Sequence, residues 1–349
     1  MRQINNLKKL IYDADTIILT THIIPDADGI GGQVALYQAL KLLGKKVFAV
    51  NEEPLHQRWK KIFKDLSPVS YKKFKQEFKQ EFKQDKKNKC NKCNAIDLFI
   101  LIDANSSERI GHRMQNLLGI SKKFICIDHH PLSLINKTKN TTHFIDSTAA
   151  ATAEIIAKLI KHLHIKYSKE MALALYSAII IDTSSFRYPN VTFHTHKLIS
   201  ELLKTGINPA VIYDQIYGAK SPKHFQLLGK ILGNVKITSD QQIAYLIIPQ
   251  KLLGKYDVDE EDTYSYINYL LVLDKIKIVC LFRELKRPKG YIKLSIRSNF
   301  QKEHLDAGKM AANLGGGGHN HSAAAIIKGS LNKVITQTLV KIRGIILDL

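Results

Sequence analysis

Short runs of apolar residues recur along the first half of the chain, and acidic or histidine side chains follow each run. The length of these runs and their Ile, Thr and Phe content predict buried strands at residues 16–21, 96–102 and 124–127. A fourth run, residues 173–181, predicts a helix because Ser168 can cap its start. Since ligands bind beyond the carboxyl ends of parallel strands, we expect the polar side chains to converge on one edge of a sheet.

The predicted elements alternate between strand and helix over this part of the chain. A helix at residues 30–43 and a strand at 46–50 follow the first strand, and helices at 149–162 and 169–181 follow the last one. Alternation of this kind is typical of an α/β fold with a doubly wound parallel sheet. We assign residues 1–188 to this N-terminal domain.

A second, smaller α/β domain is predicted at residues 226–349. Strand-like runs resume there, at residues 243–248, 276–282 and 291–297. Two domains agree with the length of 349 residues, because a domain contains about 150 residues as a rule of thumb. The pattern of residues 189–225 is mostly helical, so we predict a semi-rigid helical linker between the two domains.

Composition and charge narrow the class of protein and its partners. The chain carries 52 Lys and Arg against 31 Asp and Glu, and the net charge of +21 favours polyanionic partners. The apolar runs are shorter than a membrane span and the N-terminus has no signal-peptide pattern, so we expect a cytosolic protein without a membrane partner. Four cysteines are too few for a disulfide scaffold, and we interpret Cys90 and Cys93 as an incidental pair instead of half a zinc site.

Residues 71–94 differ sharply in composition from their surroundings. A four-residue pattern of Phe, Lys, Gln and an acidic residue starts at Phe74, Phe78 and Phe82, and a run of Lys and Asn follows it. Phe at every fourth position is compatible with a narrow helical stripe, but the segment is too polar for us to expect a contribution to the core. We predict an exposed, mobile, basic insertion, either a hairpin or a helix, with nucleic-acid contact as the alternative role.

The acidic and histidine side chains at the element ends form a candidate two-metal site. They are His22, Asp26, Asp28, Asp103, Asp128, His129, His130 and Asp182. A mixed Asp and His set without Cys favours Mn²⁺ over Zn²⁺ or Ca²⁺, and two such ions activate water for attack on a phosphoester. Gly29, Gly31 and Gly32 predict a tight turn that aims His22 and the aspartates after it at one rim.

Each residue of this set also has a simpler interpretation when it is taken alone. An aspartate after a strand is often only a helix cap, as Asp28 or Asp146 could be, and a histidine at a strand end is often a hydrogen-bonded surface residue. Four polar clusters at successive element ends favour the metal site over these readings. The chain has no Gly-x-Ser-x-Gly or P-loop motif, so serine catalysis and triphosphate hydrolysis of the P-loop kind lack support.

These motifs resemble those of the DHH phosphoesterases in order and spacing. They are His22-Ile-Ile-Pro-Asp-Ala-Asp28, Asp103 with Arg109-Ile-Gly, Asp128-His-His130 and Asp182-Thr-Ser-Ser-Phe-Arg187. The segment Gly315-Gly-Gly-Gly-His319, preceded by Ser295-Ile-Arg297-Ser, resembles the glycine-rich motif of the DHH-associated C-terminal domain. The resemblance covers nearly the whole chain. Within the superfamily it is greatest to the group of nanoRNases and 3′-phosphoadenosine 5′-phosphate (pAp) phosphatases, although Gly32 stands where a serine is usual.

The resemblance implies a role for each metal ligand and catalytic residue. His22 and Asp26 are implied to bind one Mn²⁺, and Asp103 to bridge it to a second ion, with Mg²⁺ or Co²⁺ as substitutes. The other ligands of the second ion are Asp28, His129 and Asp182. The implied catalytic residues are His130, which faces the scissile phosphate, Asp128, which orients a histidine, and Arg187.

Substrate binding is assigned to a further set of residues. They are Arg109, Arg297, Ser298, Gly315, Gly316, Gly317, Gly318 and His319. Consecutive glycines let a backbone approach a ligand closely, and their N–H groups can bind phosphate. Arg297 is a candidate to bind a phosphate through two parallel hydrogen bonds from its guanidinium group. A flexible linker is the alternative for the glycine run, but the apolar residues 322–327 after it indicate a packed segment.

We therefore predict a metal-dependent phosphoester hydrolase. The expected activity is that of a Mn²⁺-dependent phosphodiesterase and exoribonuclease, which degrades short RNA oligonucleotides (nanoRNA) to 5′-mononucleotides and also dephosphorylates pAp. The expected partners are short single-stranded RNA and pAp, and the resemblance implies a homodimer. The alternatives are a phosphodiesterase of linear or cyclic dinucleotides, a single-stranded DNA exonuclease of the same superfamily, and a non-catalytic nucleic-acid-binding protein, which the complete ligand set disfavours.

Overall fold

The chain divides into two compact units, Met1–Gly218 and Ala219–Leu349. The computed structural model describes residues 2–77, 96–130, 141–218, 220–299 and 305–347. The division falls inside the segment 189–225 that the sequence predicts to be a linker. Cys90, Cys93 and the predicted insertion from residue 78 onward lie outside the described residues.

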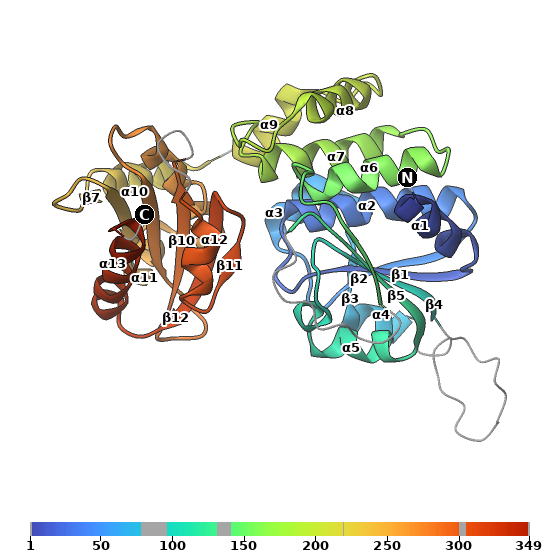
Figure 1. Ribbon diagram of the computed structural model, residues 1–349, viewed down its shortest axis with the longest axis horizontal. Helices are drawn as coiled ribbons and strands as arrows, with labels where there is room; N and C mark the ends of the chain where they lie inside the picture. Colours follow the sequence, from blue (N-terminus) through green and yellow to red (C-terminus); the bar gives the residue numbers. More distant parts are fainter. Residues whose placement is uncertain (1, 78–95, 131–140, 219, 300–304, 348–349) are drawn as a thin grey trace. The chain divides into compact units, whose positions relative to one another are not determined.

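A six-stranded parallel sheet forms the centre of the first unit (Figure 1). In spatial order its strands are β3 (Val69–Ser70), β2 (Lys46–Asn51), β1 (Thr16–Thr21), β4 (Ile96–Ile102), β5 (Ser121–Asp128) and β6 (Thr141–Ile145). The chain adds β2 and β3 on one side of β1 and the later strands on the other side, so the winding reverses between β1 and β4. This topology confirms the predicted doubly wound α/β fold, and such sheets bind ligands where the winding reverses.

Helices cover both faces of this sheet (Figure 1). On one face lie α1 (Arg2–Tyr12), α2 (Ala27–Leu42), α6 (Thr152–His162) and α7 (Lys169–Asp182), and on the other lie α4 (Tyr71–Glu77) and α5 (His112–Gly119). Successive strand residues point to opposite faces, so Ile17 and Leu19 of β1 join the core beneath α2, and Ile18 joins the core beneath α4 and α5. Burial on both faces explains why these strands are continuous apolar runs in the sequence.

The glycines after β1 have a different role from the one predicted. α2 begins at Ala27, so Gly29, Gly31 and Gly32 lie inside the helix and form no turn. A Cβ atom on Gly31 would lie 2.5 Å from the carbonyl oxygen of Ala174 in α7, which is closer than real side chains approach. The predicted glycine turn is therefore wrong, and its glycines let α2 pack closely against its neighbours.

The start of the predicted insertion contributes to the core, contrary to expectation. Residues 71–77 form α4, whose side chains Tyr71 and Phe74 are buried in the core on its face of the sheet. The Phe74 ring meets Phe48 of β2 edge to face, with the ring centroids 5.3 Å apart. The polar composition of the repeat did not predict this short amphipathic helix, because only two apolar side chains pack it against the sheet.

Two helices from the predicted linker pack onto the first unit. α8 (Phe193–Leu203) starts at a capping box made by Thr192 and Thr195, and α9 (Pro209–Tyr217) starts at Asn208, whose side chain accepts from two N–H groups. Their apolar side chains are buried in the same core as α7. α3 (Gln57–Phe63) lies against α9, and a short 3-10 helix, η1 (Lys64–Leu66), follows α3.

The second unit is built on a six-stranded mixed sheet. Its spatial order is β11 (Gly317–Gly318), β12 (Ser322–Lys328), β10 (Tyr291–Ser298), β9 (Ile278–Glu284), β8 (Ile243–Ile248) and β7 (Lys236–Ile237), and of these pairs β8 and β9 are parallel. One core contains residues of α12 (Ala307–Ala312) and α13 (Leu331–Leu347), and the other contains residues of α10 (Pro222–Leu232), α11 (Gln250–Tyr256) and η4 (Tyr266–Val272). A 3-10 turn, η3 (Glu260–Thr263), precedes η4.

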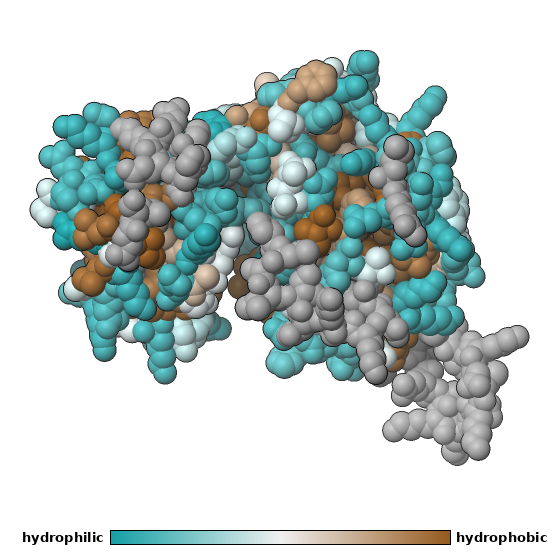
Figure 2. All heavy atoms as spheres, viewed as in Figure 1, coloured by the Kyte–Doolittle hydropathy of each residue, from teal (hydrophilic) through white to brown (hydrophobic). Residues whose placement is uncertain are grey.

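The face of the two units that Figure 2 shows is mostly hydrophilic where residues are coloured. Figure 2 shows polar residues over most of the visible face, with apolar residues in scattered patches. Among the described residues, no helix has both the length and the apolar character needed to cross a bilayer.

Candidate metal centre

Three strands deliver polar side chains to one row at the carboxyl edge of the first sheet. The ladder registers place Thr21 of β1 beside Ile102 of β4, and Ile102 beside Ile127 of β5. His22, Asp103 and Asp128 occupy the next position of each strand. This is the point where the winding reverses, so the fold itself brings the predicted residues together.

His22, Asp26 and Asp103 form a first group of possible metal ligands. The His22 Nδ1 atom lies 2.9 Å from the carbonyl oxygen of Ile23, and because a carbonyl only accepts, this nitrogen carries the proton. The other ring nitrogen, Nε2, then faces the carboxylates, 3.9 Å from Asp26 Oδ1 and 3.5 Å from Asp103 Oδ2. With Nδ1 donating to a carbonyl group, Nε2 is the nitrogen through which this histidine can bind a metal ion.

Asp28, His129 and Asp182 form a second group of the same kind. His129 Nδ1 lies 3.2 Å from the carbonyl oxygen of Ala149, which again leaves Nε2 for the acidic side chains. That atom lies 3.6 Å from Asp28 Oδ2 and 3.4 Å from Asp182 Oδ2. Asp182 ends α7, where the helix dipole is negative, so its carboxylate is unfavourable there without a nearby cation.

Asp103 lies between the two groups and offers one oxygen to each. Its Oδ2 faces His22 in the first group, while its Oδ1 lies 3.9 Å from Nε2 of His129 in the second group. The residue is buried and adopts a φ of 61°, in the left-handed region that a non-glycine residue seldom occupies. Strained backbone of this kind persists where the surrounding structure fixes it, as at functional sites.

The electrostatics of the centre fit divalent cations. Burial and the neighbouring carboxylates of Asp103 and Asp182 raise the pKa of Asp28 well above its ordinary value, because ionised acids crowded in a dry site repel one another. Burial lowers the pKa of His22, but contacts with Asp103 and Asp26 outweigh it and raise the pKa to about 10. Cations bound among these oxygen and nitrogen atoms would relieve the repulsion, and the donor set suits hard or borderline ions.

Asp128 and His130 form a hydrogen-bonded pair beside the two groups. The Asp128 carboxylate is buried and accepts from the backbone N–H of His130 at 3.1 Å and from its Nδ1 at 2.7 Å. Burial lowers the pKa of His130, but Asp128 and then Asp103 outweigh it and raise the pKa to about 9. The same carboxylate also lies close enough to Asp103 and His130 for the three to hold a metal ion.

Family comparisons agree with this geometry. The model of the DHH family N-terminal domain matches residues 16–179, and the model of the DHHA1 domain matches residues 240–342. The chain belongs to the DHH family of phosphoesterases. It is a metal-dependent phosphoesterase, with the candidate metal centre in the DHH unit and a DHHA1 unit after it.

Curated relatives extend over most of the chain. The bifunctional oligoribonuclease and PAP phosphatase NrnA of Thermus thermophilus is 29% identical over 314 residues, which cover 90% of this chain and 84% of that protein. The NrnA protein of Bacillus subtilis is 25% identical over 318 residues, or 90% of each chain. The chain therefore spans most of the length of these relatives.

Solved structures share the fold of the whole chain. An exopolyphosphatase-related protein from Bacteroides fragilis has a TM-score of 0.82 at 24% identity, with 98% of this chain and 96% of that chain covered. RecJ from Thermus thermophilus in complex with Mn²⁺ has a TM-score of 0.53 at 14% identity, with all of this chain and 55% of that chain covered. These likenesses confirm the two-domain α/β architecture.

Two arginines of the predicted site, Arg109 and Arg187, belong to the DHH unit. Arg187 follows three residues with positive φ, Ser184 to Phe186, and its guanidinium donates to the Ser184 carbonyl and hydroxyl oxygens at 2.8 and 2.9 Å. Arg109 is exposed, and its carbonyl oxygen accepts from the N–H of Ile23, next to the candidate ligand His22. Their roles toward substrate stay predictions.

The glycine-rich segment of the DHHA1 unit is an ordered strand edge. Gly317 and Gly318 pair with β12, and the N–H groups of Gly315 and Gly316 donate to carbonyl oxygens of α12. These two N–H groups are therefore engaged inside the unit, so a phosphate nest cannot use them. The four glycines are exposed, which leaves their small size as the feature that admits a ligand.

Other predicted substrate residues surround this segment. Ser298 is buried at the end of β10 and donates to the carbonyl oxygen of Asn320 at 3.0 Å. Arg297 precedes it and donates through Nη1 to the carbonyl oxygen of Ile296. His319 makes the turn between β11 and β12, where its N–H donates to the Ser322 carbonyl oxygen.

The DHH unit also has contacts to the metal centre that sequence reasoning missed. The start of α6 supplies them: Thr152 and Ala153 donate backbone hydrogen bonds to Asp28, and the Thr152 hydroxyl donates to Asp103. The sequence does predict a helix start near residue 149. It does not show that this helix start contacts Asp28, because Thr152 follows Asp28 by 124 residues.

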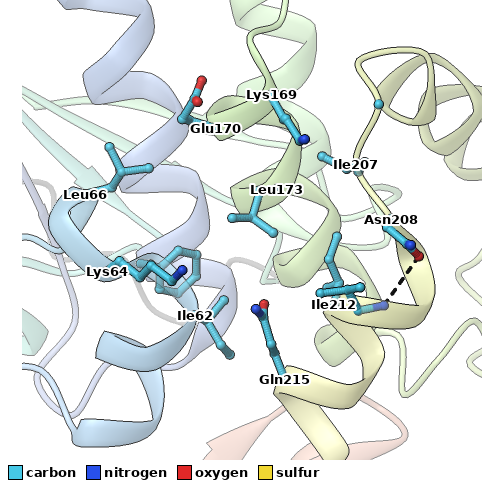
Figure 3. Close-up of a pocket in the computed structure, with 13 residues that line it drawn as sticks. Ile62, Lys64, Leu66, Lys169, Glu170, Leu173, Ile207, Asn208, Ile212 and Gln215 are labelled. Atoms are coloured by element: carbon cyan, nitrogen blue, oxygen red, sulfur yellow. Dashed lines mark hydrogen bonds between the residues drawn. The ribbon is translucent and has the colours of Figure 1, made fainter.

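A groove of about 570 Å³ lies elsewhere in the DHH unit (Figure 3). Its apolar side chains come from α3, α7 and α9, among them Ile62, Leu173 and Ile212, and Lys64 and Lys169 are at its rim. Leu173 is the lining residue of α7 that lies nearest to Asp182 along the helix, and the separation of nine residues corresponds to about 13 Å. The groove is therefore separate from the candidate metal centre.

Proposed function

We propose that the metal centre holds two Mn²⁺ ions. His22 and Asp26 are the ligands of one ion, Asp28, His129 and Asp182 those of the other, and Asp103 is shared. The observation that carries this assignment is that the two oxygens of Asp103 face different ligand groups. Mn²⁺ suits carboxylate and imidazole ligands, and the related fold of RecJ was solved with this ion. Bound ions supply charge neutralisation at the phosphate and an activated water.

In this proposal, the chain's own residues orient the phosphate beside the ions. Asp128 holds Nδ1 of His130, and Nε2 is the ring nitrogen assigned to the scissile phosphate. The pair also fixes the ring in one orientation, which lowers the entropy lost on reaching the reactive geometry. Arg187 follows the ligand Asp182 by five residues in the sequence and adds positive charge near the same place.

We propose short RNA oligonucleotides as the substrate, released as 5′-mononucleotides, and pAp as a second substrate. The support comes from the NrnA relatives, which are named for oligoribonuclease and PAP phosphatase activity and align with about nine-tenths of this chain. Arg297, His319 and the small glycines of the DHHA1 unit suit a phosphate or sugar ligand. The net charge of +21 favours such polyanions. The homodimer stays a prediction.

A substrate panel tests this function. We expect Mn²⁺-dependent release of 5′-mononucleotides from 5′-labelled RNA of two to five nucleotides, phosphate release from pAp, and slower attack on longer RNA and DNA. Asp103→Asn should lower the activity at least 10³-fold while circular dichroism shows a folded protein, because the shared ligand loses its charge. Asp146→Asn is the matched control: Asp146 also follows a strand, but its side chain only caps a turn at Thr148.

Two outcomes would contradict the proposal. Hydrolysis of cyclic di-AMP in preference to every linear substrate would replace the substrate class and leave the metal centre standing. Unchanged hydrolysis in Asp103→Asn would remove the two-ion arrangement itself.

A further inference from the structure

Thr152, the first residue of α6, contacts two residues of the metal centre at once. Its backbone N–H donates to Asp28 Oδ2 at 2.6 Å, and its hydroxyl donates to Asp103 Oδ1 at 3.0 Å. Thr152 is fully buried, so bulk water does not compete for either hydrogen bond. A hydrogen bond to a carboxylate in such a site is stronger than one at the surface.

The Thr152 hydroxyl and His130 Nδ1 both lie against the same oxygen of the Asp103 carboxylate, Oδ1, and the hydroxyl is the closer of the two, at 3.0 Å against 3.5 Å. With Oδ1 held by Thr152, the other oxygen, Oδ2, faces His22 Nε2 at 3.5 Å. Rotation of the carboxylate would withdraw Oδ1 from the side of His129, from which it is now 3.9 Å away. A ligand that serves two ions must present both oxygens in one orientation, and the Thr152 bond selects that orientation.

Backbone groups of residues 149–153 also hold residues of the metal centre in place. Ala151, at the cap position, supplies no side-chain hydrogen bond to the helix. Asp28 from α2 accepts instead from the N–H groups of Thr152 and Ala153, and the carbonyl oxygen of Ala149 holds His129. Residues 149–153 therefore contact three of the proposed ligands, of which Asp103 alone is held by a side chain from this segment.

We propose that Thr152 is a positioning residue of the metal centre, whose hydroxyl orients Asp103 so that one carboxylate oxygen faces each ligand group. This inference rests on the proposed function, because it takes Asp103 to be the shared ligand. Removal of a group that orients a metal ligand lowers metal affinity or activity by about 10- to 100-fold, and we expect a loss of that size here.

The test compares Thr152→Val with Thr152→Ser. Valine removes the hydroxyl and keeps both the backbone N–H and nearly the same volume, whereas serine keeps the hydroxyl. Thr195→Val is the matched control, because Thr195 is also buried in the DHH unit and its hydroxyl accepts only from the N–H of Thr192 at the start of α8. Mn²⁺ affinity of the full chain is measured by isothermal titration, and circular dichroism verifies folding.

The expected result is weaker Mn²⁺ binding in Thr152→Val by about 10- to 100-fold, recovery in Thr152→Ser, and no change in Thr195→Val. Wild-type Mn²⁺ affinity in Thr152→Val would overturn the positioning role. If the valine variant does not fold, Thr152→Ala is titrated in its place with the same criteria.

The variant Asp103→Asn distinguishes a failure of the Thr152 inference from a failure of the proposed two-ion centre. If Asp103→Asn loses Mn²⁺ binding while Thr152→Val keeps it, the positioning role fails and the metal centre stands. If Asp103→Asn binds two Mn²⁺ ions as tightly as the wild type, the shared ligand is misassigned, and both proposals fall together.

Discussion

At the scale of single residues, backbone carbonyl groups decide which histidine nitrogen is available to a metal ion. His22 and His129 each have Nδ1 against a carbonyl oxygen and Nε2 toward the carboxylates. The types and approximate places of these residues followed from the sequence, because parallel strands end at one edge. Their tautomers did not, because the carbonyl group that holds His129 belongs to Ala149, 20 residues later in the chain.

The roles of the two aspartates after β1, Asp26 and Asp28, likewise could not be assigned from the sequence. Helix capping was a reasonable alternative for Asp28, yet Asp26 caps α2 and Asp28 accepts from the start of α6. Both functions agree with carboxylates at helix N-termini. The sequence could not assign them, because the partner of Asp28 is defined only once α6 packs beside α2.

A pair of neighbouring glycines gives a residue-scale prediction in the DHHA1 unit. A Cβ on Gly316 would lie 2.1 Å from the carbonyl oxygen of Ala324, whereas one on Gly317 would meet nothing within 4 Å. Gly316→Ala should lower the free energy of unfolding by about 1–3 kcal/mol, since the strand edge must shift. It should also lower kcat/KM for RNA oligonucleotides with Mn²⁺ affinity unchanged.

Gly317→Ala is the control for that prediction. It should change stability by no more than about 0.5 kcal/mol, as measured by urea unfolding. Equal losses of stability in the two variants would show that the clash at Gly316 is not the cause.

At the scale of elements, apolar runs predicted the buried strands and α7 well, because elements covered on both sides carry continuous apolar sequence. Edge elements were harder. β6, Thr141–Ile145, has mixed polarity and was not predicted. α1 was missed although Ile4, Leu7 and Ile11 are buried at helical spacing, which is a signal that the sequence does contain.

The end of α6 gives an element-scale prediction. The N–H of His164 donates to the Lys161 carbonyl oxygen and that of Ile165 to the Ile160 carbonyl oxygen, the pattern of a Schellman motif. His164 has a φ of 60° there, which favours glycine. His164→Gly should therefore raise the free energy of unfolding by roughly 0.5–1 kcal/mol, as measured by chemical denaturation.

The same substitution two residues earlier is its control. His162 is the last residue of α6 and has helical backbone geometry, where glycine lowers stability by up to about 1 kcal/mol. His162→Gly should thus destabilise the protein, and a destabilised His164→Gly variant would show that the left-handed position is not strained.

At the scale of the whole molecule, the two units have separate hydrophobic cores. No described residue belongs to a core of both units. The candidate metal centre lies in the DHH unit, and most of the predicted substrate residues belong to the DHHA1 unit. Sequence motifs predicted this division, but the described contacts place α8 and α9 with the DHH unit, because apolar side chains of these helices complete its core.

This separation predicts that Mn²⁺ stabilises only one of the two units. Trp59, the single tryptophan of the chain, lies in α3 of the DHH unit, so its fluorescence reports that unit alone. Free Mn²⁺ at 100 times its dissociation constant adds about 2.7 kcal/mol, which should raise the fluorescence-detected Tm by roughly 5–10 °C for a unit of this size. EDTA should reverse the shift, and Asp103→Asn should not show it. The Tm of the DHHA1 unit, a second transition detected by far-ultraviolet circular dichroism, should not change with Mn²⁺. An equal shift of that transition would mean that the two units unfold together. No shift of either transition would mean that the centre does not bind the ion.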